Sequence, residues 1–149
     1  MKLKVEVPIN ATKEEIWKVI TDIDGAPDRI SGIETVEVHH NPGEDLVGMK
    51  WTETRILFGK SATETMWVTE AEKNKYYKTR AESHGAIYTS IMRIDEKNGQ
   101  NFLGMEFSSQ ALTFGAKFMA TVLGPLFKGA TKKAVLKDLE DIKRHLEGQ

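Results

Sequence analysis

The sequence predicts an α+β fold in which antiparallel strands are followed by one long C-terminal helix. Between residues 34 and 108, short runs that alternate apolar and polar side chains recur, and turn residues separate them. From residue 113 to residue 147 the apolar spacing changes to that of a helix. The 149 residues contain no internal repeat, low-complexity tract or linker, so we expect a single domain spanning residues 1–149.

The N-terminal segment predicts one strand and two short helices. Charged and apolar residues alternate over Lys2–Ile9, which is typical of a strand. Thr12-Lys13-Glu14-Glu15 matches a capping box. The apolar residues behind it have helical spacing and predict a helix that ends near Asp24-Gly25. Residues 26–32 are expected to form a second short helix or a turn.

Further strands are predicted between turn signals such as Asn41-Pro42-Gly43, Gly85 and Lys97-Asn98-Gly99. The predicted strands cover residues 34–40, 47–58, 62–71, 76–84, 86–95 and 102–108. Their short connections favour an antiparallel meander.

The two halves of the C-terminal helix differ in pattern. The second half has one apolar stripe among charged residues, formed by Val135, Leu139, Ile142 and Leu146. The first half is apolar over a wide arc and must contact something on more than one side. Its stripes are Phe114, Phe118, Val122 and Leu126, and beside them Met119, Leu123 and Phe127. Gly124-Pro125 predicts a kink or break between the halves, because an internal proline removes a helical hydrogen bond.

The strand over residues 47–58 carries charge on its apolar side. One side holds Met49, Trp51, Glu53, Arg55 and Leu57, and the other holds Lys50, Thr52 and Thr54. Successive strand residues point to opposite faces, so Glu53 and Arg55 should point inward with Trp51. Buried charge is costly unless it is paired, hydrated or used. The pattern therefore favours a cavity over a solid core.

Composition narrows the class of protein. The net charge is −1, from 21 basic and 22 acidic residues, which does not favour a nucleic-acid partner, and no basic cluster indicates an anionic membrane. With no cysteine, disulfides and thiolate chemistry are excluded. The first residues contain no apolar signal-peptide core, so we expect a cytoplasmic protein. Residues 118–127, the most apolar stretch, are too few for an integral membrane segment, which needs about 20.

The order of these elements resembles the START-like (SRPBCC) superfamily. Within it, the chain is most similar to the polyketide cyclase/dehydrase and lipid-transport group, related to the birch pollen allergen. The residues that carry the resemblance run from Val7 to Trp17 (VPINATKEEIW), from Val47 to Trp51 (VGMKW) and from Lys137 to Lys143 (KDLEDIK). The resemblance covers essentially the whole chain.

This resemblance implies a helix-grip fold, in which a curved antiparallel sheet wraps around the long C-terminal helix and two short helices lie near the N-terminus. It also implies an apolar cavity between sheet and helix. Members of the group bind or carry lipids, sterols, polyketides and plant hormones, and a minority are enzymes. The family has no universal catalytic motif, so no catalytic residue follows from it.

Strand parity predicts the residues that face such a cavity. The face would be large, apolar and aromatic with few polar groups, as in small-molecule sites. The candidate ligand-binding residues are Trp51, Glu53, Arg55, Glu64, Met66, Tyr77, Ser83, His84, Tyr88, Met105, Phe107, Phe118 and Val122.

Two features of this set have alternative interpretations. Glu53, Arg55 and Glu64 would hold the polar end of a ligand; alternatively, Glu53 and Arg55 pair with each other or lie in water. His84 precedes Gly85, where a bend would turn it inward beside Tyr88, and the pair would suit acid–base work. Alternatively, His84 is a surface histidine.

The leading hypothesis is therefore a protein that binds or carries a small hydrophobic molecule in an internal cavity. The alternative is a cyclase/dehydratase-type enzyme that uses a cavity carboxylate, Glu53 or Glu64, with His84 or Tyr88. A third hypothesis is an interaction module or weak homodimer formed through the apolar side of residues 114–127. No metal ligand set or dinucleotide motif is found, so no metal or cofactor is expected.

Overall fold

The computed structural model describes residues 1–43, 45–57 and 59–148, without the side chains of Leu57, Leu123 and Phe127. Phe58 and Gln149, the predicted ends of a strand and of the domain, lie outside these residues. The strands are β1 (Lys2–Ile9), β2 (Ile33–His40), β3 (Lys50–Leu57), β4 (Lys60–Glu72), β5 (Tyr76–Ser83), β6 (Ala86–Lys97) and β7 (Gln100–Ala111). The helices are α1 (Lys13–Thr21), α2 (Ala26–Arg29) and α3 (Phe114–Leu146).

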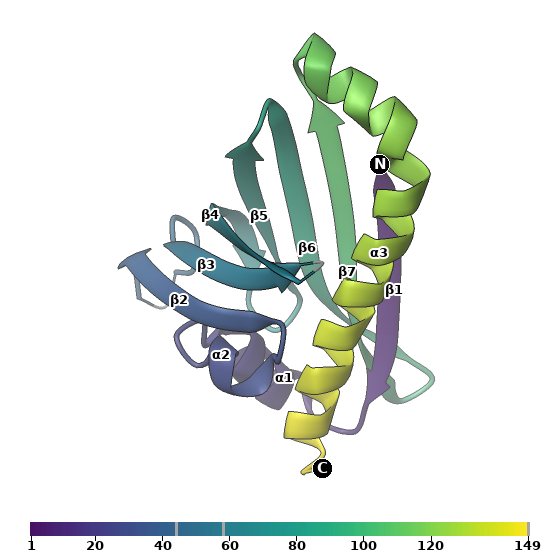
Figure 1. The fold of residues 1–149 in the computed structure, drawn as a ribbon. Helices are drawn as coiled ribbons and strands as arrows, with labels where there is room; N and C mark the ends of the chain where they lie inside the picture. The colour runs from purple at the N-terminus through teal and green to yellow at the C-terminus, as the bar shows by residue number, and fades with distance from the viewer. Residues whose placement is uncertain (44, 58, 149) are drawn as a thin grey trace.

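The strands form one antiparallel sheet that curves around α3 (Figure 1). Its order is β1-β7-β6-β5-β4-β3-β2, so the meander from β2 to β7 is completed by β1 at the far edge. Helices α1 and α2 lie between β1 and β2 in sequence and cover one end of the sheet (Figure 1). The predicted α+β class and the helix-grip arrangement are confirmed.

The capping box before α1 forms as predicted, but α1 is shorter than predicted. Thr12 Oγ1 accepts from the Glu15 amide at 3.1 Å, and Glu15 Oε1 accepts from the Thr12 amide at 3.1 Å, which completes the capping box. Helix α1 ends at Thr21, short of the predicted end near Asp24-Gly25. The backbone leaves the helical conformation at Asp22, whose carbonyl accepts from the Arg29 guanidinium.

The core lies between the sheet and the C-terminal half of α3. Leu139 is fully buried, and Val135 and Ile142 beside it are buried as well. They pack in one cluster with side chains of the sheet and of α1, including Val68, Leu103 and Ile16. The stripe predicted for the second half of the helix is therefore the side that holds α3 to the sheet.

The N-terminal half of α3 is not covered in this way. Phe114 is 87% exposed, Phe118 61% and Leu126 74%, and Met119 and Val122 are also more than half exposed. Pro125 lies inside a continuous helix, so the predicted interruption is not a break. Figure 1 shows α3 bending in this half, with its first turns leaning away from the axis of the rest. The predicted kink is the better description, because the helix continues through the proline.

Candidate functional site

The concave face of the sheet, which faces α3, carries the side chains that parity predicted. Register places Trp51, Met66, Ala81, Tyr88 and Ser109 directly opposite one another across β3 to β7. Directly opposed residues of an antiparallel pair share a face, so these five form one row across the sheet. A neighbouring row contains Val68, Thr79, Ser90 and Phe107.

This face has a closed half and an open half. In the closed half, toward α1, the side chains of Val68, Tyr77, Met92 and Leu103 are buried under the C-terminal part of α3. In the open half, the side chains are only partly buried. We define the open half as Glu64, Met66, Ser83, Tyr88, Ser90 and Phe107. The large apolar side chains that the structure describes in the N-terminal half of α3 are exposed and do not close it.

Glu53 and Arg55 are paired inside the protein. Glu53 is only 9% exposed, and its carboxylate accepts from Arg55 Nε at 2.7 Å and from Trp51 Nε1 at 3.4 Å. Arg55 also donates through both terminal nitrogens to the two oxygens of Asp138 on α3, at 3.3 and 2.6 Å. The pKa of Arg55 is raised, because Asp138 and Glu53 outweigh the effect of burial. The network ties β3 to α3, and contact of these side chains with a ligand stays a prediction.

Sequence reasoning missed Asp138, although a signal was present. Asp138 lies three residues after Val135 and four before Ile142, so it shares the apolar side of the helix. A carboxylate on an apolar helix stripe indicates a buried partner, just as Arg55 does on the apolar side of β3. An ion pair between the inward carboxylate of α3 and the inward guanidinium of β3 could therefore have been predicted.

Glu64 is the carboxylate of the open half. It lies directly opposite Glu53 on the neighbouring strand and on the same face. Its pKa is raised, first by partial burial and then by the negative charge of Glu53, while His84 and Arg55 act in the opposite direction. Glu64 makes no ion pair with the described residues, so it remains available to a polar group of a ligand.

Tyr88 and His84 lie near Glu64, but the side chain of His84 is exposed, so the surface interpretation of this residue is the correct one. Burial and the charge of Glu64 raise the pKa of the Tyr88 hydroxyl. His84 occupies the left-handed region with φ of 50°, and Gly85 follows with φ of 75°, which makes a two-residue hairpin turn between β5 and β6. A side chain at Gly85 would clash with Thr113, so this turn is fitted against the start of α3. Leu112 donates its amide to the Gly85 carbonyl at 2.8 Å.

An aromatic pair gives the open half its apolar surface. The rings of Tyr88 and Phe107 stack with centroids 6.0 Å apart and an interplanar angle of 25°. Both are partly buried, and Ser90, directly opposite Phe107, is a small residue that is also partly buried. Apolar surface beside a few polar groups is typical of small-molecule sites.

The remaining predicted residues lie in different surroundings. Tyr77 is buried, and its hydroxyl donates to the Ile20 carbonyl at 3.1 Å, so it belongs to the closed half. Met105 is partly buried against the core. Phe118 and Val122 are exposed on α3. The fold therefore does not bring these four residues together with Glu64 and His84 in one enclosed space.

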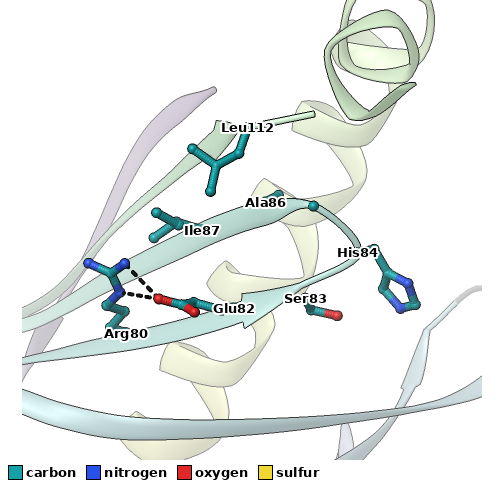
Figure 2. A pocket seen from close by; sticks show the side chains of 8 residues that line it. Arg80, Glu82, Ser83, His84, Ala86, Ile87 and Leu112 are labelled. Atoms are coloured by element: carbon teal, nitrogen blue, oxygen red, sulfur yellow. Dashed lines mark hydrogen bonds and ion pairs between the residues drawn. The ribbon is translucent and has the colours of Figure 1, made fainter. Parts of the chain in front are cut away.

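Two surface hollows lie at opposite ends of the molecule. One, of about 350 Å³, lies at the β5–β6 turn, where Ser83 and His84 lie opposite Leu112. Figure 2 shows Arg80 paired with Glu82 at its outer side. The other, of about 450 Å³, lies between α1 and the end of α3. Neither is an enclosed cavity between sheet and helix.

Two general features of the described residues concern metals and membranes. In residues 1–43, 45–57 and 59–148, no three His, Asp or Glu side chains are grouped so as to hold a metal ion. None of the helices in the same residues has the length and apolarity needed to cross a membrane.

Comparison with known proteins gives the same picture of the fold. A family model described as polyketide cyclase/dehydrase and lipid transport matches residues 1–147. No curated protein is significantly similar to the chain.

Solved structures of the same fold come from bacteria and plants. A START superfamily protein from Mycobacterium smegmatis has 13% identity and a TM-score of 0.80, covering 99% of this chain and 97% of that one. The Zhui aromatase/cyclase from Streptomyces sp. R1128 has 16% identity and a TM-score of 0.75, with coverages of 99% and 93%. Ginseng major latex-like protein 151 from Panax ginseng has 12% identity and a TM-score of 0.79, with coverages of 98% and 97%.

Proposed function

The chain belongs to the polyketide cyclase/dehydrase and lipid transport family, and from this membership we propose that it binds or carries a small hydrophobic molecule on the open half of its concave face. The observation that carries the proposal is the partly buried Tyr88–Phe107 stack next to Glu64. Aromatic rings that are left partly uncovered beside a carboxylate provide an apolar surface and a polar contact together.

The ligand on this proposal has one polar end. Glu53 and Arg55 are engaged with each other and with Asp138, so the polar groups with capacity to spare are Glu64, His84 and the Tyr88 hydroxyl. These groups can accept and donate hydrogen bonds, which suits a hydroxyl, phenol or carboxyl group. The apolar part of the ligand would lie along Tyr88, Phe107 and Met66. An aromatic or polyketide-like molecule, or the end of a lipid, has this chemistry.

Native mass spectrometry of the purified protein tests the proposal directly. We expect a population of protein with one small molecule bound, which is released and identified under denaturing conditions. For protein without cargo, the neutral dye 1-N-phenylnaphthylamine is the probe, and its fluorescence should rise on binding. The proposal fails if the dye does not bind and native spectra of protein from several sources show no adduct.

Ser90→Phe is expected to weaken dye binding by at least about tenfold, which corresponds to about 1.4 kcal/mol. The new ring would occupy the space beside Phe107 that the ligand would otherwise fill. Titration of the dye into the variant measures the loss.

The matched control is Thr89→Phe, the neighbouring residue on β6. It points to the opposite face of the sheet, so the same ring should leave dye affinity within about twofold of the original. Equal losses in the two variants would show that the dye does not bind on the concave face.

The second candidate function is an enzyme of the cyclase or dehydratase type. The observation that favours it is the raised pKa of Glu64, because a raised pKa makes the carboxylate a stronger base and keeps more of the group protonated at a given pH. Glu64 would serve as general acid or base, and His84 or Tyr88 would move the second proton. Glu64→Gln with full turnover on a substrate would exclude this role for Glu64.

His84→Asn is expected to raise the pKa of Glu64 further. The positive charge of His84 lowers that pKa, so removing it favours the protonated carboxyl. Side-chain carbon NMR measures the titration, with Glu64→Gln identifying the resonance. A Glu64 pKa that does not change, or that falls, would show that the two side chains are not close enough to share a proton.

A further inference from the structure

Most of the exposed large apolar side chains of the described residues lie on the N-terminal half of α3 or directly before it. The exposed residues are Leu112, Phe114, Phe118, Met119, Val122 and Leu126. Phe114, Phe118, Val122 and Leu126 follow one another at intervals of four, so they lie along one side of the helix. A contiguous apolar surface of this kind marks an interaction site.

Charge is segregated onto the same part of the chain. Between Glu106 and Asp138 there is no acidic residue, whereas Lys117, Lys128, Lys132, Lys133 and Lys137 all lie in this stretch. It therefore carries +5, although the whole chain carries −1. The near-zero net charge of the protein hides this division, which is why composition did not indicate an anionic partner.

Four of these lysines are available to such a partner. Lys117, Lys128, Lys132 and Lys133 are exposed, and none forms an ion pair with the described residues. Lys117 and Lys128 are three helical turns apart, so they project from the same side of α3, beside the apolar stripe. An apolar stripe bordered by lysines is the pattern of a helix that lies in the interface of a membrane.

A second copy of the chain fits this surface poorly. A symmetric dimer through α3 would place the lysine-rich stretches of both copies against each other, and the stretch offers no carboxylate to pair with them. Like charges in one interface oppose association. The surface instead needs a partner that is apolar and negatively charged.

We propose that residues 112–133, here called the docking segment, bind the surface of a membrane that contains anionic lipids. The apolar side chains enter the boundary between headgroups and acyl chains, and the lysines contact lipid phosphates. The hydrogen bond from Leu112 to Gly85 holds the start of this segment against the β5–β6 turn. Docking therefore brings the rim of the open half, at His84, to the membrane surface. The docking itself requires no bound ligand, so an experiment can support or contradict it independently of the proposed function.

Co-sedimentation with extruded vesicles tests the proposal on the full chain. Vesicles of phosphatidylcholine alone are compared with vesicles that contain phosphatidylglycerol at 30 mol %. We expect the protein to pellet with the anionic vesicles and to remain in solution with the neutral ones. Binding should weaken as NaCl is raised from 0.1 to 0.5 M, because salt screens charges at the surface.

Two sets of variants separate the two contributions. The triple variant K128Q/K132Q/K133Q should lower the partition coefficient by about 100-fold, since each lysine at an anionic surface contributes about fivefold. Its control K2Q/K50Q/K73Q removes the same charge from exposed lysines of the sheet and its β4–β5 turn, together called the sheet lysines, and should leave binding within about threefold. Phe114→Ser with Leu126→Ser should also lower binding, whereas Val47→Ser with Ile56→Ser, exposed apolar residues elsewhere, should not. Circular dichroism establishes that each variant is folded.

The proposal is overturned if the protein does not pellet with anionic vesicles, or pellets equally with neutral ones. It is also overturned if the sheet lysines matter as much as those of α3, because a general charge effect would then explain the binding. Sedimentation velocity provides the remaining comparison. A concentration-dependent dimer that Phe114→Ser with Leu126→Ser abolishes, together with unchanged vesicle binding, would assign the apolar surface to a second copy.

Discussion

Arg55→Met is expected to lower the free energy of unfolding by about 4 kcal/mol, in the range measured when one partner of a buried ion pair is removed. The variant keeps the apolar length of the side chain but leaves Glu53 and Asp138 as two buried carboxylates without a cation. Asp138→Asn should cost less, because Arg55 would keep Glu53 as its partner. Urea denaturation of the three proteins measures the difference.

The loss in Arg55→Met should depend on pH in a defined direction. Burial already raises the pKa of Asp138 although Arg55 lowers it, so removal of Arg55 moves the pKa of Asp138 in the folded state further above that in the unfolded state. The folded variant then binds more protons than the unfolded chain, so its stability relative to the original protein increases as the pH is lowered from 7 to 5. A loss that grows on acidification would contradict the pairing.

Arg80→Met is the matched control for the same substitution. Arg80 pairs with Glu82 on the outer face of β5, where both side chains are about half exposed. Exposed ion pairs contribute little, so this variant should stay within about 0.5 kcal/mol of the original stability. A comparable loss in both variants would mean that the change reflects the loss of arginine from a strand rather than the broken network.

Leu139→Ala is expected to lower the free energy of unfolding by about 3 to 4 kcal/mol. Leu139 is fully buried between α3 and the sheet, and truncation there removes apolar contacts and leaves a cavity. The large apolar side chains that the structure describes in the N-terminal half of α3 are exposed, so they do not compensate for this loss. Thermal and urea unfolding measure it.

Leu126→Ala is the control for that truncation within the same helix. Leu126 is exposed, and its loss should change stability by no more than about 0.5 kcal/mol. If the two substitutions cost the same, the N-terminal half of α3 would be packed on the sheet in solution, and the open half of the concave face would be covered.

The stability losses in Arg55→Met and Leu139→Ala together show which half of α3 is held to the sheet. A helix held by Leu139 and by the Arg55–Asp138 pair is fixed at its C-terminal half, while the large apolar side chains that the structure describes in residues 112–133 stay exposed. That division leaves the stacked Tyr88 and Phe107 reachable from outside. The proposed ligand binding and the proposed membrane docking both depend on this division of α3. They involve different residues, and separate measurements test them.

Much of the fold could be predicted from local patterns. The capping box at Thr12, the inward side of β3 and the apolar stripe of the second half of α3 all follow from the spacing of neighbouring residues. The end of α1 at Thr21 was not predicted; the Asp22 carbonyl beyond it accepts from Arg29, seven residues later, and local spacing does not indicate such a contact. The full lengths of β4 and β7 were likewise set by pairing with their neighbours.

By itself, the sequence determined which elements form, in which order, and which side of each strand faces inward, because periodicity is a property of adjacent residues. Only the tertiary structure decided what the inward charges do. Arg55 meets a carboxylate 83 residues away, and that meeting depends on how α3 is placed and rotated on the sheet. The same placement decided that half of the concave face stays uncovered, since an apolar side of a helix does not indicate which surface it will cover.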